Sequence, residues 1–273
     1  IIERAIEHGI TYFDTADIYD KGVNEDIVGK TLKKYQDRSD IVIGSKVGNH
    51  LADDGSTFWD PSKAYIKEAV KGSLSRLGLD HLDLYQLHGG TIDDPLDETI
   101  AAFDELKQEG IIRAYGISSI RPNVINCYLK HSDIETLMSQ FNLIDNRPEA
   151  LLDDVHAKKV KVLARGPVFK GLLTSNSNQA LDRKFSEGIF DYTYPELGET
   201  VASIKEIESN LSSLTFNYLT SHDALGSIIV GASSVNQLDE NVENYKLSKD
   251  ISLEKLKAAR DRVKNLEYTQ HLK

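Results

Sequence analysis

Short runs rich in β-branched and aromatic residues alternate along this chain with longer amphipathic segments. Seven runs are each expected to form a strand, at residues 10–16, 41–47, 82–89, 112–118, 136–142, 160–166 and 227–233. Between them, the segments 24–35, 62–78, 96–110 and 122–132 carry apolar residues at spacings of three and four, which is typical of amphipathic helices. The alternation predicts an α/β fold in which helices cover parallel strands.

The start of the chain changes the strand count that we expect. Residues 1–9 have the pattern of a helix that should follow a strand. A parallel barrel with one strand absent would expose two unpaired edges. We therefore expect a (β/α)8 TIM barrel whose first strand is missing from this chain, which would begin inside a longer protein. The length of 273 residues fits one barrel of roughly 250 residues or two smaller domains. Because no Pro/Gly/Ser-rich linker divides it, residues 1–273 are expected to be a single, N-terminally incomplete barrel domain.

Two segments do not fit the alternation. Residues 174–199 look like a long irregular loop, either a functional flap or a surface insertion. Residues 252–268 have helical character with no strand after them and are expected to form an added helix.

The composition of the chain limits the classes of molecule that it is expected to bind. The formal net charge is -11, which disfavours a nucleic-acid groove or an anionic membrane surface, because both require clustered Lys and Arg. The one cysteine, Cys127, cannot form an internal disulfide, and no run approaches about 18 apolar residues. We expect a cytoplasmic protein with a small-molecule partner, no nucleic acid and no membrane, and we leave a homo-oligomer open.

Polar side chains gather at the carboxyl ends of the first three runs. Asp14, Tyr19, Lys46 and His88 supply a carboxylate, a phenol, an ammonium and an imidazole, and strand ends of a parallel barrel share one face. A tyrosine with the usual pKa of about 10 is a poor acid at neutral pH, but a nearby ammonium stabilises its phenolate. Each residue alone also has an ordinary structural explanation, as a helix cap, a solvated charge, a packed aromatic ring or a core histidine. Together they form a candidate set for proton transfer.

Six motifs of the chain resemble, in order, those of the aldo-keto reductases. They are GITYFDTADIY, GSKVG, DLYQLHG, GISSI, ARGPVFKGLLT and VGASSVNQLDENV. The resemblance runs nearly end to end and implies NADPH-dependent reduction of an aldehyde or ketone to an alcohol. It implies that Tyr19 is the general acid, that Lys46 and Asp14 tune it, and that His88 shapes the pocket for the carbonyl group.

The same resemblance assigns residues to the cofactor. Ser118, Ser119 and Gln140 stand where the family binds the nicotinamide carboxamide, although the pair is Ser-Ser where many members have Ser-Asn. Arg165, with Gly166 and Pro167 after it, occupies a position where many members stack an aromatic ring on the nicotinamide. A guanidinium plane can also stack or reach a pyrophosphate, so this site is expected to be altered rather than lost.

The segment after the last run predicts a phosphate site. Gly231, Ser233 and Ser234 lie just before an expected helix, whose unpaired amide groups and dipole favour an anion. By resemblance Ser233, Ser234 and Gln237 would face the adenosine 2'-phosphate, with Asn241 near the adenine. Gln237 replaces the arginine of some members, so the preference for NADPH over NADH is expected to be moderate.

Two other functions remain open at this stage. A protein related to this family could keep the barrel and the cofactor but act in regulation with little turnover, as ion-channel accessory subunits do. An unrelated barrel hydrolase could use paired carboxylates such as Asp14 and Asp17. The sequence has no GxGxxG after a strand, no GxxxxGK[ST] loop, no CxxC and no HxH or HExxH, so we expect no metal.

Overall fold

The computed structural model describes residues 1–35, 39–52 and 56–272. The chain forms two compact units. Unit 1 is Ile1–Met138 together with the C-terminal residues from Gln270, and unit 2 is Ser139–Thr269. That the whole chain is a single domain stays a prediction.

Unit 1 is built on parallel strands. They pair in the order β1, β2, β5, β6 and β7. Their bounds are Tyr12–Asp14 for β1, Val42–Val47 for β2, Leu82–Leu87 for β5, Ile112–Ser118 for β6 and Thr136–Gln140 for β7, of which the first three residues belong to unit 1. In the pairing of β1 with β2, Asp14 lies opposite Gly44, two residues before Lys46. A short antiparallel pair, β3 (Asn49–Leu51) and β4 (Thr57–Trp59), follows β2.

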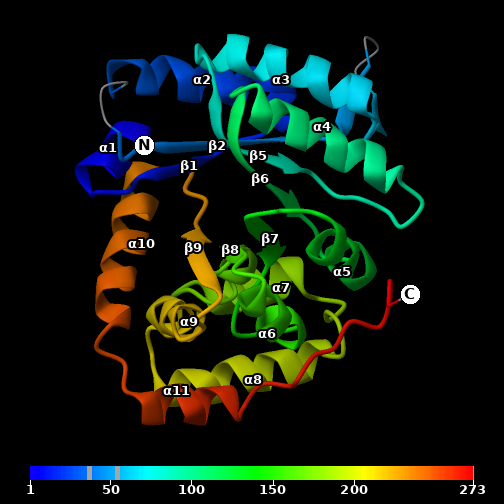
Figure 1. The fold of residues 1–273 in the computed structure, drawn as a ribbon. Helices are drawn as coiled ribbons and strands as arrows, with labels where there is room; N and C mark the ends of the chain where they lie inside the picture. The colour runs from blue at the N-terminus through cyan, green and yellow to red at the C-terminus, as the bar shows by residue number, and fades with distance from the viewer. Residues whose placement is uncertain (36–38, 53–55, 273) are drawn as a thin grey trace. The chain divides into compact units, whose positions relative to one another are not determined.

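Helices cover this sheet and lie side by side, as Figure 1 shows for α2, α3 and α4. The helices of unit 1 are α1 (Ile2–Glu7), α2 (Val23–Leu32), α3 (Lys63–Leu77), α4 (Leu96–Gln108) and α5 (Pro122–His131). Two 3-10 turns, η1 (Tyr19–Gly22) and η2 (Lys33–Tyr35), flank α2. Helix α3 begins where the Ser62 side chain accepts a hydrogen bond from Tyr65 N, and it ends at Gly78 in the left-handed conformation.

The core of unit 1 is aromatic at its centre. Tyr85, Phe103 and Tyr115 are at most 1 % exposed, and the rings of Phe103 and Tyr115 stack with centroids 5.4 Å apart. Helix α2 packs against α3 so closely that a Cβ on Gly29 would lie 2.3 Å from the carbonyl oxygen of Leu77. A glycine at this position is therefore required by the packing of the two helices.

Unit 2 contains the parallel strands β8 (Lys161–Arg165) and β9 (Leu225–Ile229) and most of the later helices. These helices are α6 (Glu149–Ala157), α7 (Ser177–Lys184), α8 (Tyr194–Ile207), α9 (Leu211–Thr220), α10 (Val235–Ser248) and α11 (Leu253–Arg260). A 3-10 turn, η3 (Phe169–Gly171), follows β8. Helix α9 buries most of its side chains, including Leu214 and Phe216, and α10 packs against it.

The helical and strand pattern of the sequence is largely confirmed. Within the described residues, seven strands have a parallel partner, one in each of the seven predicted runs. The interpretation of 174–199 as an irregular loop was wrong, because the segment contains α7 and the start of α8. Helix α8 begins at a capping box in which Thr193 and Glu196 each bond the other's backbone N–H. The predicted C-terminal helix forms as α11 but ends at Arg260.

None of the helices within residues 1–35, 39–52 and 56–272 has the length and apolar character needed to cross a membrane.

Candidate active site

In unit 1 the four residues of the proposed proton-transfer set come together around Lys46. Lys46 lies on β2 and is 0 % exposed, and its Nζ contacts the Asp14 carboxylate at 2.5 Å. The same nitrogen donates to the carbonyl oxygen of Thr15 at 2.7 Å and to Tyr19 Oη at 3.3 Å. An ammonium has three N–H donors, and these three acceptors use all of them. Tyr19 Oη therefore receives a hydrogen bond from Lys46 and keeps its own proton for another acceptor.

Tyr19 and His88 complete the group. Tyr19 begins η1, its backbone N–H donates to Ala16 O, and its side chain is exposed enough to meet a ligand. The His88 ring stands edge-on to the Tyr19 ring, with centroids 5.7 Å apart. His88 directly follows β5, and its backbone N–H donates to Val47 O at the end of β2. The ends of three neighbouring strands thus bring the four side chains to one place, as the sequence predicted.

Asp14 is held on both of its oxygens. Oδ2 accepts from Lys46, and Oδ1 accepts from Tyr12 Oη at 3.1 Å. Burial raises the pKa of Asp14, whereas Lys46 and the hydrogen bond from Tyr12 act to lower it. Sequence analysis did not identify Tyr12, although residues two apart on a strand share a face.

A second buried carboxylate lies behind β2. Glu25 on α2 is 0 % exposed, accepts from Ser45 Oγ at 2.5 Å and forms an ion pair with Arg76 Nε at 2.6 Å. Burial, together with the charge of Glu25, raises the pKa of nearby Asp17 to about 7. Asp14 is engaged by Lys46, whereas Asp17 lies in a setting that favours its neutral form. The two aspartates therefore lie in different electrostatic settings.

Trp59 fixes the loop beside His88. Its indole lies so close to Gly48 that a Cβ there would be 2.5 Å from the ring, and a Cβ on Gly89 would be 3.3 Å away. The indole N–H donates to Asp94 at 2.8 Å. Phe58, in contrast, is half exposed and stacks on His50. Trp59 thus packs the loop that carries His88.

Two predicted cofactor residues lie at the end of β6 in unit 1, Ser118 as its last residue and Ser119 directly after it. Ser118 and Ser119 are nearly buried, and the backbone N–H of Ser119 donates to Met138 O. Ser119 Oγ accepts from the backbone N–H of Arg121 at 3.2 Å, which leaves its hydroxyl proton as a donor. These hydroxyls have the donors that a carboxamide oxygen requires.

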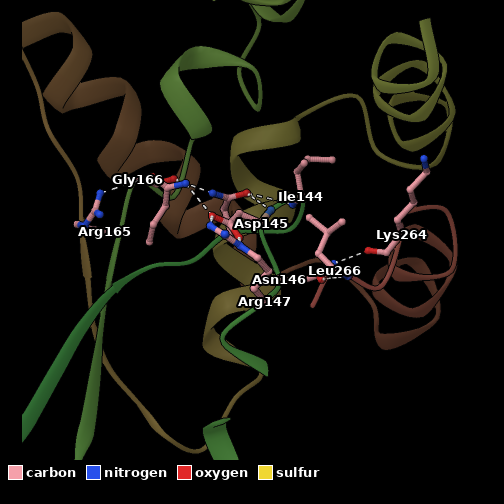
Figure 2. Close-up of polar contacts among 10 residues, drawn as sticks. Ile144, Asp145, Asn146, Arg147, Arg165, Gly166, Lys264 and Leu266 are labelled. Carbon is pink, nitrogen blue, oxygen red and sulfur yellow. Dashed lines mark hydrogen bonds and ion pairs between the residues drawn. The ribbon is translucent and has the colours of Figure 1, made fainter. Parts of the chain in front are cut away.

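The other predicted cofactor residues lie in unit 2, in two groups. Gln140 and Arg165 are linked by Arg165 Nη1, which is 3.5 Å from Gln140 Oε1, and Gly166 follows with a positive φ of 65°. Figure 2 shows Arg165 and Gly166 beside a turn that contains Asp145 and Arg147. Buried Pro167 accepts a hydrogen bond on its carbonyl from Thr215.

The second group is the amino end of α10. The Ser234 side chain caps the helix by accepting from Gln237 N at 3.2 Å, and Gln237 Oε1 accepts from both the N–H and the hydroxyl of Ser233 at 2.9 Å. Gly231 precedes this turn, and Asn241 lies further along α10. The first turn of α10 contains no acidic residue. Because Gln237 Oε1 takes both donors of Ser233, an anion at this helix end would have to displace that amide oxygen, whereas the Ser234 hydroxyl keeps its own proton as a donor.

Within residues 1–35, 39–52 and 56–272 no group of three or more His, Cys, Asp or Glu side chains could hold a metal ion. Cys127 is a half-buried free thiol on α5.

Comparison with known proteins decides the family. The sequence model of the Aldo/keto reductase family matches residues 1–259. The chain belongs to the aldo-keto reductase family. It is 49 % identical to an uncharacterized oxidoreductase, YqkF, of Bacillus subtilis, over 99 % of this chain and 89 % of that protein. It is 34 % identical to the NADH-specific methylglyoxal reductase of Escherichia coli, over 61 % of this chain and 55 % of that protein.

A solved structure shows the same fold. The aldo-keto reductase AKR11C1 from Bacillus halodurans, in its holo form, matches with a TM-score of 0.91 and 46 % identity, over 100 % of this chain and 89 % of that one. The fold class predicted from the sequence, the parallel α/β barrel of the aldo-keto reductases, is thereby confirmed. Members of this family reduce carbonyl compounds with a nicotinamide cofactor, and the chain is accordingly an oxidoreductase of that kind.

Proposed function

We propose that this aldo-keto reductase reduces an aldehyde or ketone to an alcohol with Tyr19 as the general acid, and that its cofactor is NADPH. The observation that supports Tyr19 is the hydrogen bond from the fully buried Lys46 ammonium to Tyr19 Oη. An N–H donor on the phenol oxygen stabilises the phenolate that remains after the proton has left. Asp14 and Thr15 O hold the ammonium so that its third donor faces Tyr19.

The residues of unit 1 have distinct tasks in this reaction. When bound, the reduced nicotinamide supplies a hydride to the carbonyl carbon. Tyr19 Oη donates its proton to the carbonyl oxygen as negative charge develops there, and Lys46 stabilises the resulting phenolate until solvent returns a proton. His88, beside Tyr19, donates a hydrogen bond to the same oxygen and fixes its direction. Asp14 keeps Lys46 charged and oriented.

The residues proposed to bind the cofactor fit its chemical groups. Ser118 and Ser119 of unit 1 have hydroxyl donors, and Gln140 of unit 2 has an amide, and each of these groups can bond a carboxamide. Arg165, with Gly166 and Pro167, would lie against the nicotinamide or pyrophosphate. Ser233, Ser234 and Gln237 would bind the 2'-phosphate, with Gly231 giving room before the helix and Asn241 near the adenine. NADPH rather than NADH is favoured because no acidic side chain in the first turn of α10 would repel a 2'-phosphate.

Replacing Tyr19 tests the reaction. Tyr19→Phe should lower kcat with a reactive aldehyde by a factor of about 100 or more, because the acid is lost while the ring remains. The dissociation constant of NADPH, measured by isothermal titration calorimetry, should change by less than about twofold, since Tyr19 is not among the residues proposed to bind the cofactor. The control is Tyr194→Phe, an exposed tyrosine whose hydroxyl bonds Asp182. Equal losses of turnover and cofactor binding in Tyr19→Phe would refute the assigned role.

The choice of cofactor needs a separate measurement. NADPH should give a higher kcat/KM than NADH, and Ser233→Ala with Gln237→Ala should reduce that ratio by weakening NADPH alone. An enzyme that favours NADH, as the name of its Escherichia coli relative states for that protein, would refute the phosphate assignment but leave Tyr19 untouched.

A further inference from the structure

Unit 2 contains a buried carboxylate to which the proposed reaction gives no role. Asp145 is 0 % exposed and lies in the turn after β7. Its Oδ1 accepts from Arg147 Nε at 2.7 Å, and its Oδ2 accepts from Arg147 Nη2 at 2.9 Å and from Gln140 Nε2 at 2.7 Å. Figure 2 shows Asp145 and Arg147 in this turn, with Arg165 and Gly166 beside it.

The charge state of this group follows from its partners. Arg147 binds Asp145 through two parallel hydrogen bonds, the geometry in which a guanidinium matches an ionised carboxylate. Burial alone would lower the pKa of Arg147, but the hydrogen bonds and charge of Asp145 raise it. The guanidinium is also covered by aromatic rings, 4.0 Å from the Phe190 centroid and 5.0 Å from that of Tyr268. Asp145 is therefore an ionised carboxylate held in a fixed direction.

An ionised carboxylate can only accept hydrogen bonds, and this fixes the amide of Gln140. The NH2 group of Gln140 must face Asp145, so Oε1 must face the opposite way. Arg165 Nη1 approaches that oxygen at 3.5 Å. Gln140 consequently turns its acceptor oxygen away from Asp145, while one N–H of its NH2 group is engaged by that carboxylate.

The backbone of the turn is held as firmly as the side chains. Asn142 Oδ1 accepts from the backbone N–H of Ile144 and of Asp145, and its Nδ2 donates to Gly166 O at 3.0 Å. Asn146 bonds the backbone of Lys264 and Leu266 near the end of unit 2. Asp145 thus has little freedom to move away from Gln140.

We propose that Asp145, held by Arg147, is a positioning residue that sets Gln140 as an acceptor for the N–H of the cofactor carboxamide. This rests on the proposed function, in which Gln140 binds that group. The consequence is selectivity: a cofactor with a carboxamide NH2 fits Gln140, whereas one with a methyl ketone at the same place cannot donate. Replacing Asp145 by Asn puts an NH2 group where a carboxylate oxygen was. In that variant Arg147 should bond the one remaining side-chain oxygen, and the new NH2 group should face Gln140. Gln140 would then turn its own oxygen towards that NH2 group and present its NH2 donors to the ligand.

The probes are two analogues of NADP+ that differ at this group. Thionicotinamide adenine dinucleotide phosphate keeps the NH2, and 3-acetylpyridine adenine dinucleotide phosphate lacks it. Calorimetry on the full chain should show the thionicotinamide analogue binding about tenfold more tightly than the acetylpyridine analogue. In Asp145→Asn the ratio should fall to about one or invert, and Gln140→Met should also bring it to about one. In the double variant Asp145→Asn with Gln140→Met, the ratio should equal that of Gln140→Met.

The matched control is Asn146→Ala, in the same turn. It removes hydrogen bonds to the 264–266 backbone and should lower Tm while leaving the binding ratio unchanged, which separates positioning from a merely structural role. If Asp145→Asn fails to fold, Arg147→Lys keeps the charge but loses the paired geometry, and it should reduce the ratio.

The outcomes separate this inference from the function on which it rests. If neither analogue nor NADPH nor NADH binds the wild-type chain, the proposed function fails. If the wild-type chain binds both analogues equally, or a folded Asp145 or Arg147 variant keeps the wild-type ratio, the positioning role is refuted while the reductase assignment stands. Independent effects of Asp145→Asn and Gln140→Met on the ratio would refute it as well.

Discussion

At the scale of single residues, Lys46 and Asp14 show how a pair of buried charges depends on complete hydrogen bonding. Each ion would be costly to bury alone, because it gives up its hydration. Here every donor of the ammonium has an acceptor, and both oxygens of Asp14 have a donor. The pair is thus both a structural element and the proposed support of Tyr19.

Lys46→Met should damage stability and turnover together. The change leaves Asp14 buried without its counter-ion, and its pKa, already raised by burial, should rise further. We expect the free energy of unfolding at pH 8 to fall by about 3–5 kcal/mol, the usual cost of removing one partner of a buried pair, and kcat to fall at least as far as in Tyr19→Phe.

Urea denaturation and steady-state kinetics measure the two effects. The control is the double variant Lys46→Met with Asp14→Asn, which removes the stranded charge. It should regain part of the stability but none of the turnover. A double variant as unstable as Lys46→Met would show that packing, rather than the unpaired carboxylate, causes the loss.

At the scale of helices and strands, the close contact of α2 with α3 depends on one glycine. A Cβ at Gly29 would meet backbone atoms of Leu77 at 2.3 to 2.6 Å, so the two helices would have to move apart. Outside the backbone of its own helix, the atoms nearest to a Cβ at Gly72, on α3, would all belong to the end of the Arg76 side chain, the closest at 3.0 Å. The same substitution should therefore have opposite effects at the two positions.

Gly29→Ala is expected to lower the free energy of unfolding by about 2–3 kcal/mol through overpacking. Gly72→Ala should raise it by up to about 1 kcal/mol, because alanine favours the helix. Urea denaturation of both variants measures the difference. Equal effects of the two substitutions would mean that α2 and α3 separate at little cost.

The elements show what can be predicted from sequence and what cannot. Runs of β-branched and aromatic residues predicted the seven parallel strands, although burial is nearly continuous in β2, β5 and β6 and slight in β9. Strand-end polarity indicated the candidate set Asp14, Tyr19, Lys46 and His88. Segment 174–199 was misread because α7 is mostly polar, and the capping box at Thr193 was overlooked. Asp145 and Arg147 lie only two residues apart, but their pairing depends on how the turn after β7 folds. The Arg76 and Glu25 pair, 51 residues apart, depends on the packing of α2 against α3.

At the scale of the whole molecule, one buried carboxyl group should make the stability depend on pH. Burial and Glu25 raise the pKa of Asp17 to about 7, while Arg76 and Lys46 act in the opposite direction. The folded chain then keeps this proton to a higher pH than the unfolded chain. The contribution of Asp17 is fully present below its ordinary pKa of about 4 and is lost as the pH rises to about 7.

Asp17→Asn removes this dependence. The stability of the variant relative to the wild type should increase by about 3 kcal/mol between pH 5 and pH 8, since about 1.4 kcal/mol corresponds to each pH unit over which only the folded state holds the proton. Denaturation midpoints at the two pH values measure it, with Asp93→Asn, on an exposed loop, as the control. If the stability difference between Asp17→Asn and the wild type is the same at both pH values, the pKa of Asp17 is not raised by burial, and its carboxyl group is well solvated.

Trp59 gives the molecule an optical property of its own. It is the one tryptophan in the sequence, and its indole is held against Gly48 and Gly89 by contact and to Asp94 by a hydrogen bond. Its emission therefore comes from one known place, next to the loop that carries His88. The wavelength of that emission should report whether this loop stays packed when a substrate arrives, without any label being attached.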